Sequence, residues 1–86
     1  MSQEERIARV TAVQAKYTHD LMRKPHVVGT AVGTAKKGGV YTQEIVLVVM
    51  VDTKVPLDAL RPEDRIPAEL DGVRVDVQET GMFMAQ

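Results

Sequence analysis

Apolar residues in the first quarter of the chain recur at intervals of three and four, which is the spacing of one helix face. The set is Ile7, Val10, Val13, Tyr17 and Leu21. Ser2 and Glu5 have capping-box spacing, in which each side chain bonds the other residue's backbone N–H at a helix start. Pro25 disfavours helical geometry at the residue before it. The pattern predicts an amphipathic helix over about residues 3–23.

The next segment alternates with a period of two, as a β-strand does. Over residues 26–35 one face carries valine and threonine, whereas the other carries Gly29, Ala31 and Gly33. Side chains this small allow a close approach, so we expect the helix or another backbone to lie over them. The pair Gly38–Gly39 predicts a hairpin turn, because glycine reaches the positive φ angles of such turns.

A second strand is predicted over residues 41–52, which contain an uninterrupted apolar run from Ile45 to Val51. A run without alternation is typical of a strand buried on both faces. One helix covers only one face, so residues 53–72 or another copy of the chain are expected to cover the other. Three prolines restrict that segment to short helical turns. Its expected apolar anchors are Leu57, Leu60, Ile66 and Leu70.

A third strand is predicted over residues 73–79, because valine alternates there with polar residues after an Asp71–Gly72 turn. The proline-rich crossover can deliver this strand to either edge of the sheet, so strand order and the orientation of the third strand stay open. Residues 80–86 form a tail. We therefore expect one α+β domain over residues 1–86, with an N-terminal helix packed on a three-stranded sheet.

Composition argues against most catalytic and cofactor chemistry. The chain has no cysteine, which removes disulfides, thiolate catalysis and the commonest zinc sites. His19 and His26 lack zinc-ligand spacing, and the glycines match no phosphate-binding pattern. Ser2, the only serine, is explained by its capping role, and the interleaved charges of residues 61–69 are typical of a solvated loop. We expect no catalytic residue, metal or cofactor.

Charge and aromatic content limit the classes of partner that we expect this chain to bind. Eleven basic and twelve acidic residues give a net charge of −1, and the chain has one Phe, two Tyr and no Trp. Neither a phosphate-backbone footprint nor a base-stacking platform is present, so nucleic acid is not an expected partner. No apolar run approaches the ~18 residues of a membrane span, and the charged N-terminus does not resemble a signal peptide. We expect a cytoplasmic protein.

Self-association is the remaining way to stabilise so small a core, since disulfides and metals are missing. The two-sided apolar strand and the apolar tail supply the candidate contacts. The candidate interface residues are Ile45, Leu47, Val49, Met82, Phe83 and Met84. The tail docks either on its own sheet or in a neighbouring subunit or partner groove. The sequence predicts a non-enzymatic, homo-oligomeric interaction or scaffold domain of undefined size and symmetry.

Several blocks occur in a fixed order: Pro25–Gly33, a Lys-Gly-Gly hairpin, Val55–Leu57, Arg65–Pro67 and Asp71–Val77. Over about residues 20–80 they resemble the segment before the catalytic domain in certain bacterial trypsin-like peptidase-related proteins. The chain has no Gly-Asp-Ser-Gly motif, so no peptidase activity is implied. The resemblance implies an alternative function, a pro-segment-like inhibitor or chaperone of a peptidase that uses the tail. A small-ligand module with a pocket between subunits is a third hypothesis.

Overall fold

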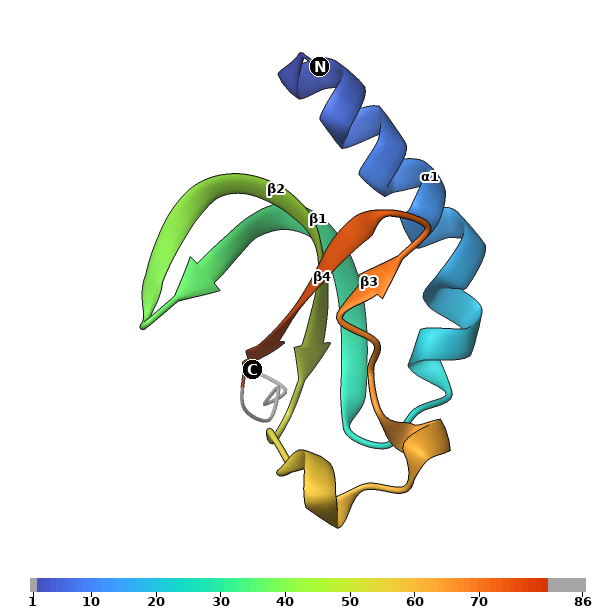
Figure 1. Ribbon diagram of the computed structural model, residues 1–86. Helices are drawn as coiled ribbons and strands as arrows, with labels where there is room; N and C mark the ends of the chain where they lie inside the picture. Colours follow the sequence, from blue (N-terminus) through green and yellow to red (C-terminus); the bar gives the residue numbers. More distant parts are fainter. Residues whose placement is uncertain (1, 81–86) are drawn as a thin grey trace, which may run out of the picture.

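A computed structural model describes residues 2–80, in which one helix packs against a four-stranded sheet (Figure 1). Two 3₁₀ turns, η1 (Leu57–Ala59) and η2 (Pro62–Asp64), lie between the second and third strands. The main elements are α1 (Gln3–Met22), β1 (Val27–Lys37), β2 (Val40–Val51), β3 (Glu69–Leu70) and β4 (Val73–Glu79). The predicted α+β class is confirmed.

The helix α1 begins at the predicted capping box. The Ser2 hydroxyl accepts from the Glu5 N–H at 3.1 Å, and the Glu5 carboxylate accepts from the Ser2 N–H at 3.4 Å. The N–H of Arg23, the C-cap residue, donates to the Asp20 carbonyl at 3.2 Å. The first turns of α1 project past the sheet (Figure 1). Ile7, the first residue of the apolar stripe, is accordingly 39% exposed.

The sheet has the order β1-β2-β4-β3, so β2 lies in its centre. β1 and β2 form the predicted antiparallel hairpin. β4 pairs with β2 in parallel, with Val49 opposite Val77, on the side away from β1. Because β4 runs parallel to β2, the crossover over residues 53–72 must carry the chain back along the length of β2 before β4 begins. A tight turn is too short to do this.

The prediction of three strands is wrong by one, because residues 69–70 of the predicted crossover form β3. Asp71 and Gly72 both have positive φ, at 50° and 79°, which is the geometry of a tight two-residue hairpin turn. This turn folds Leu70 back onto Val73, and the Val75 N–H donates to the Ala68 carbonyl at 2.9 Å. A two-residue strand is too short to show a period in the sequence.

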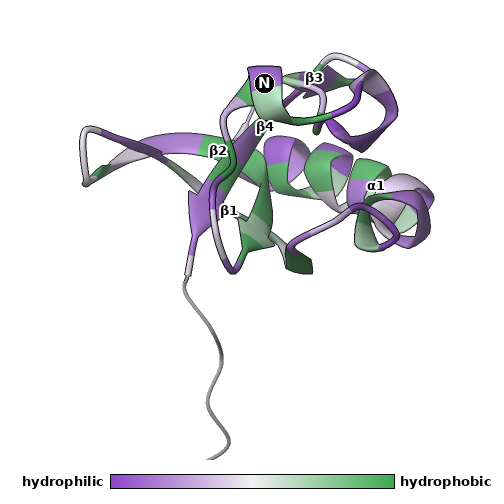
Figure 2. Cartoon of the chain, turned by 90° about the horizontal axis from the view of Figure 1, so that it is seen from below, coloured by the Kyte–Doolittle hydropathy of each residue, from purple (hydrophilic) through white to green (hydrophobic). Residues whose placement is uncertain are grey.

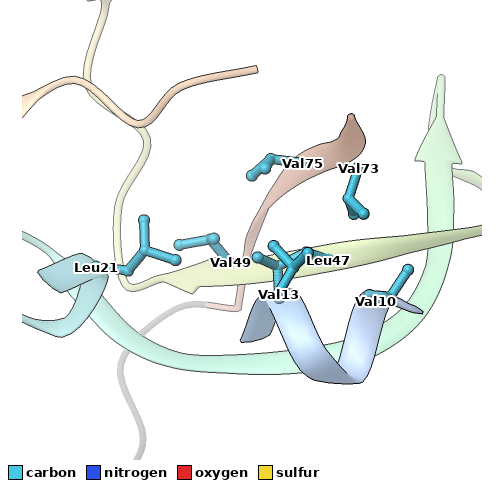
Figure 3. Close-up of a cluster of buried hydrophobic side chains, with 7 residues drawn as sticks. All are labelled: Val10, Val13, Leu21, Leu47, Val49, Val73 and Val75. Atoms are coloured by element: carbon cyan, nitrogen blue, oxygen red, sulfur yellow. The ribbon is translucent and has the colours of Figure 1, made fainter. Parts of the chain in front are cut away.

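The main core lies between α1 and the sheet (Figure 3). Its buried residues are Val10, Val13, Leu21, Leu47, Val49, Val73 and Val75. Ile66 and Leu70 pack against this cluster, as predicted for anchors of the crossover. Leu57 does not act as an anchor, because it lies on the short turn η1 beyond the end of β2 and is 64% exposed.

The opposite face of β2 is also buried, as the continuous apolar run predicts. Val46 and Val48 form a second cluster with Ala35 of β1. Among residues 2–80, neither residues 53–72 nor a second layer of structure covers these side chains. The long β1–β2 hairpin curls over this face instead (Figure 1). Figure 2 shows that the outer part of the hairpin is mostly hydrophilic, so the apolar residues gather at the body of the domain.

Side chains of β4 hold the curl in place. The Gln78 amide Nε2 donates to the Thr34 carbonyl at 3.1 Å, and the Asp76 carboxylate accepts from the Lys36 N–H at 2.8 Å. Both contacts join β4 to the far part of β1 across the central strand. The sheet thus approaches a partly closed barrel at this end.

The small-residue face of β1 lies inside this curl. Gly29, Ala31 and Gly33 pair in register with Met50, Val48 and Val46. Of the two expected covers for these small residues, the helix or another backbone, the helix is wrong: the α1 side chains of Gln14 and Thr18 bond the Thr30 hydroxyl on the other face, at 3.2 and 3.0 Å. A Cβ on Gly29 would lie 2.9 Å from Met50 Cε. Met50 Cε is the end of a flexible side chain and can move, whereas a Cβ on Gly33 would lie 3.3 Å from Cγ2 of the stiffer Val48. Small residues therefore suit the inner side of the bend, where cross-strand side chains crowd together.

Candidate interaction site

The free edge of β1 is the longest unpaired strand edge in the described part of the chain. In the sheet order β1-β2-β4-β3, one side of this 11-residue strand has no neighbouring strand among residues 2–80. From Val27 to Ala35 the strand contains no charged residue and no proline. Charges, prolines and bulges are the usual devices that prevent an edge from pairing with another chain. The two irregularities of β1 lie near its ends, so the edge is regular from Gly29 to Thr34.

The backbone groups of this edge divide into a closed part and an open part. Alternate residues of a strand direct their N–H and C=O groups to the same side. The Thr80 N–H donates to the Val51 carbonyl, so Val51 faces β4, and the alternate residue Met50 faces β1 and its partner Gly29. Thr34 alternates with Gly29 and therefore faces away from β2, where its carbonyl accepts from Gln78 Nε2. Thr30 and Val32 share the alternation of Thr34 within the regular stretch, so their backbone groups point to the same free side. Because the sheet curls, Gln78 of β4 occupies the β1 edge at Thr34. The backbone groups of Thr30 and Val32 face the same edge and have no neighbouring strand among residues 2–80.

The side chains beside the open part carry no charge. The Thr30 hydroxyl lies within hydrogen-bond distance of Gln14 Nε2 and Thr18 Oγ1, and these contacts are partly buried. Thr18 also donates from Oγ1 to the Gln14 carbonyl. A second β-strand would therefore meet neutral polar groups and small apolar side chains here, without repulsion between like charges.

The structure places the interface residues expected in β2 inside the chain's own core. Leu47 and Val49 are 0% exposed beneath α1, and Ile45 packs partly buried against the same cluster. A second copy reaches these residues only if α1 moves away. The expected tail residues Met82, Phe83 and Met84 lie outside the described residues. Sequence reasoning missed the β1 edge, because the sequence left open which edge of the hairpin the third strand joins.

A second surface feature, the apolar pocket, lies at the carboxyl ends of β2 and β4. It has a volume of about 210 Å³. Its apolar walls are Val51, Val55, Leu57, Leu60, Ile66 and Val77. His26 lies on its rim with a φ of 69°, and its Nδ1 is 2.9 Å from Asp52 Oδ1. Apolar walls with few polar groups favour an apolar occupant.

The β3–β4 turn is fastened to α1 by a cluster of charged and polar groups. Lys16 Nζ and the Tyr17 hydroxyl each donate to the Asp71 carboxylate at 2.9 Å, and Arg9 Nη2 donates to the Asp71 carbonyl at 2.8 Å. The hydrogen bond from Lys16, followed by that from Tyr17, lowers the pKa of Asp71. The same bond raises the pKa of Lys16. Because every member already has a partner inside the domain, this cluster orients the turn.

The other titratable groups that the sequence analysis considered lie on separate elements of the described chain. Among residues 2–80, no three His, Asp or Glu side chains lie close enough together to hold a metal ion. His19 is exposed on α1, whereas His26, directly before β1, pairs with Asp52, directly after β2. Arg61 and Glu63 form an exposed pair at 4.0 Å, as expected for a solvated loop.

In the described part of the chain, no helix combines the length and the apolar content that crossing a membrane requires. No protein-family model matches the chain, and no curated protein is significantly similar to it. The resemblance to segments that precede trypsin-like peptidase domains therefore stays a prediction.

Proposed function

We propose that this chain is a self-associating interaction domain, in which two copies pair through the open edge of β1. The observation that carries the proposal is the uncharged, proline-free edge from Val27 to Ala35, which has no strand neighbour among residues 2–80. Unpaired edges of this kind readily accept another strand, because each added residue pair satisfies exposed backbone groups.

The pairing of two identical edges is antiparallel and closes about a two-fold axis, since the same residues then face each other from both copies. The backbone groups of Thr30 and Val32 support an axis near the middle of β1. A two-fold axis perpendicular to the sheet brings both α1 helices to the same face. Gln14 and Thr18, which contact Thr30, would then lie beside the contact in both copies. Two four-stranded sheets become one continuous sheet.

Single-cysteine variants test this arrangement, because the chain has no cysteine of its own. Directly opposed residues of an antiparallel pair have Cβ atoms about 4.5–5.5 Å apart, close to what a disulfide requires. We expect that one variant among Thr30→Cys, Ala31→Cys and Val32→Cys, the residue that faces its own copy across the axis, gives an intermolecular disulfide under mild oxidation. Ala15→Cys, on the exposed surface of α1, is the matched control and stays uncrosslinked.

Light scattering of the unmodified chain is measured on the same samples. The proposal requires twice the chain mass of 9.5 kDa. A single-chain mass at a concentration of about 100 μM, or equal crosslinking of the β1 variants and the Ala15→Cys control, would overturn it.

A further inference from the structure

The apolar pocket lies directly where the described chain leaves β4. Val51 of β2 and Val77 of β4 form part of its wall. The Thr80 N–H donates to the Val51 carbonyl at 2.9 Å, which continues the pairing of β4 with β2 by one residue. The Glu79 carboxylate accepts from the Lys54 N–H at 2.7 Å, and Lys54 also lines the pocket. These bonds hold the last described residue against the pocket wall.

The size of the apolar pocket matches amino-acid side chains better than a free ligand. An apolar cavity of about 150 Å³ accommodates a benzene molecule, whereas pockets for larger small molecules span about 300–1,000 Å³. The observed volume of about 210 Å³ suits one aromatic ring with part of a second apolar side chain. Leu57 at its rim is 64% exposed, so an occupant that covers it removes apolar surface from water.

The sequence that follows Thr80 contains such side chains. Met82, Phe83 and Met84 are consecutive, and Phe83 is the only phenylalanine. A chain extends at most about 3.6 Å per residue, so Phe83 can lie up to ~11 Å from Thr80. The pocket begins at Val51, which is bonded to Thr80.

We propose that the apolar pocket binds the Phe83 side chain of the same chain, with a neighbouring methionine covering Leu57. The same chain is favoured over a second copy, because a short tether gives an effective concentration in the mM range. Binding of Phe83 in the pocket does not use the free edge of β1, so this inference goes beyond the proposed function and does not depend on it.

Methyl NMR spectroscopy on the full chain tests the proposal, because the single Phe makes the ring resonances unambiguous. We expect nuclear Overhauser effects (NOEs) between the Phe83 ring and methyl groups of Val55, Leu57 and Leu60. Phe83→Ala should shift these methyl resonances, since the ring current is removed. Tyr41→Ala is the matched control: this aromatic side chain is 62% exposed near the hairpin turn, and its loss leaves the pocket resonances unchanged.

A second variant reads the contact from the pocket side. Leu57→Ser changes an exposed residue and keeps the core intact, and it should weaken the Phe83 contacts. Absence of the NOEs together with unchanged pocket methyls in Phe83→Ala would overturn the proposal. NOEs seen only between differently labelled molecules in a mixed sample would overturn the same-chain assignment. Because β1 crosslinking is measured separately, failure here is distinguishable from failure of the proposed function.

Discussion

Two glycines with positive φ angles provide a matched comparison of what the β3–β4 turn contributes to stability. Gly38 has a φ of 57° in the β1–β2 turn, and Gly72 has a φ of 79° in the β3–β4 turn. A Cβ added at Gly38 meets nothing within 4 Å, whereas one added at Gly72 would lie 2.9 Å from Arg9 Nη2. Alanine at either position adopts an unfavourable backbone conformation, but only at Gly72 must Arg9 also move.

The magnitudes follow from these contacts. Left-handed backbone geometry costs a non-glycine residue about 1–2 kcal/mol. Arg9 Nη2 donates to the Asp71 carbonyl at 2.8 Å, and loss of an intramolecular hydrogen bond costs about 0.5–1.5 kcal/mol. Because this bond is exposed, the lower part of that range applies. We therefore expect Gly38→Ala to lower the free energy of unfolding by about 1 kcal/mol and Gly72→Ala by about 1.5 kcal/mol.

Urea unfolding followed by circular dichroism measures both changes at one protein concentration, so that self-association is held constant. A double-mutant cycle isolates the cause. In an Arg9→Ala background the clash is absent, so Gly72→Ala should there cost only about as much as Gly38→Ala, about 1 kcal/mol. The reasoning is refuted if the two glycine variants are equally destabilised, or if removal of Arg9 leaves the cost of Gly72→Ala unchanged.

Leu47→Ala removes a fully buried side chain and should lower the free energy of unfolding by about 3–5 kcal/mol, whereas Val40→Ala, at an exposed site, should change it by less than about 0.5 kcal/mol; comparable urea midpoints would contradict this. The Lys16 and Tyr17 hydrogen bonds lower the pKa of Asp71, so their contribution is present above about pH 4 and is lost as the pH falls through the lowered pKa. Asp71→Asn should therefore reduce the acid dependence of the urea midpoint between about pH 6 and 2.5, and an unchanged slope would exclude this role.

Local patterns predicted most element boundaries well, because helix and strand periods depend on neighbouring residues. The helix predicted over residues 3–23 spans Gln3–Met22, and the strand predicted over 73–79 spans Val73–Glu79. The continuous apolar run also predicted correctly that β2 is buried on both faces. Each of these properties can be read within a window of a few turns or strand residues.

The relations between distant segments were decided only by the tertiary structure. The sequence alone left open the parallel pairing of β4 with β2, the curl that covers Val46 and Val48, and the free edge of β1. Leu57 and Leu70 are the same residue type in one segment, yet only Leu70 packs against the core. The local sequence determines which face of an element is apolar. The packing of all elements together determines what covers that face, because burial is a property of several segments at once.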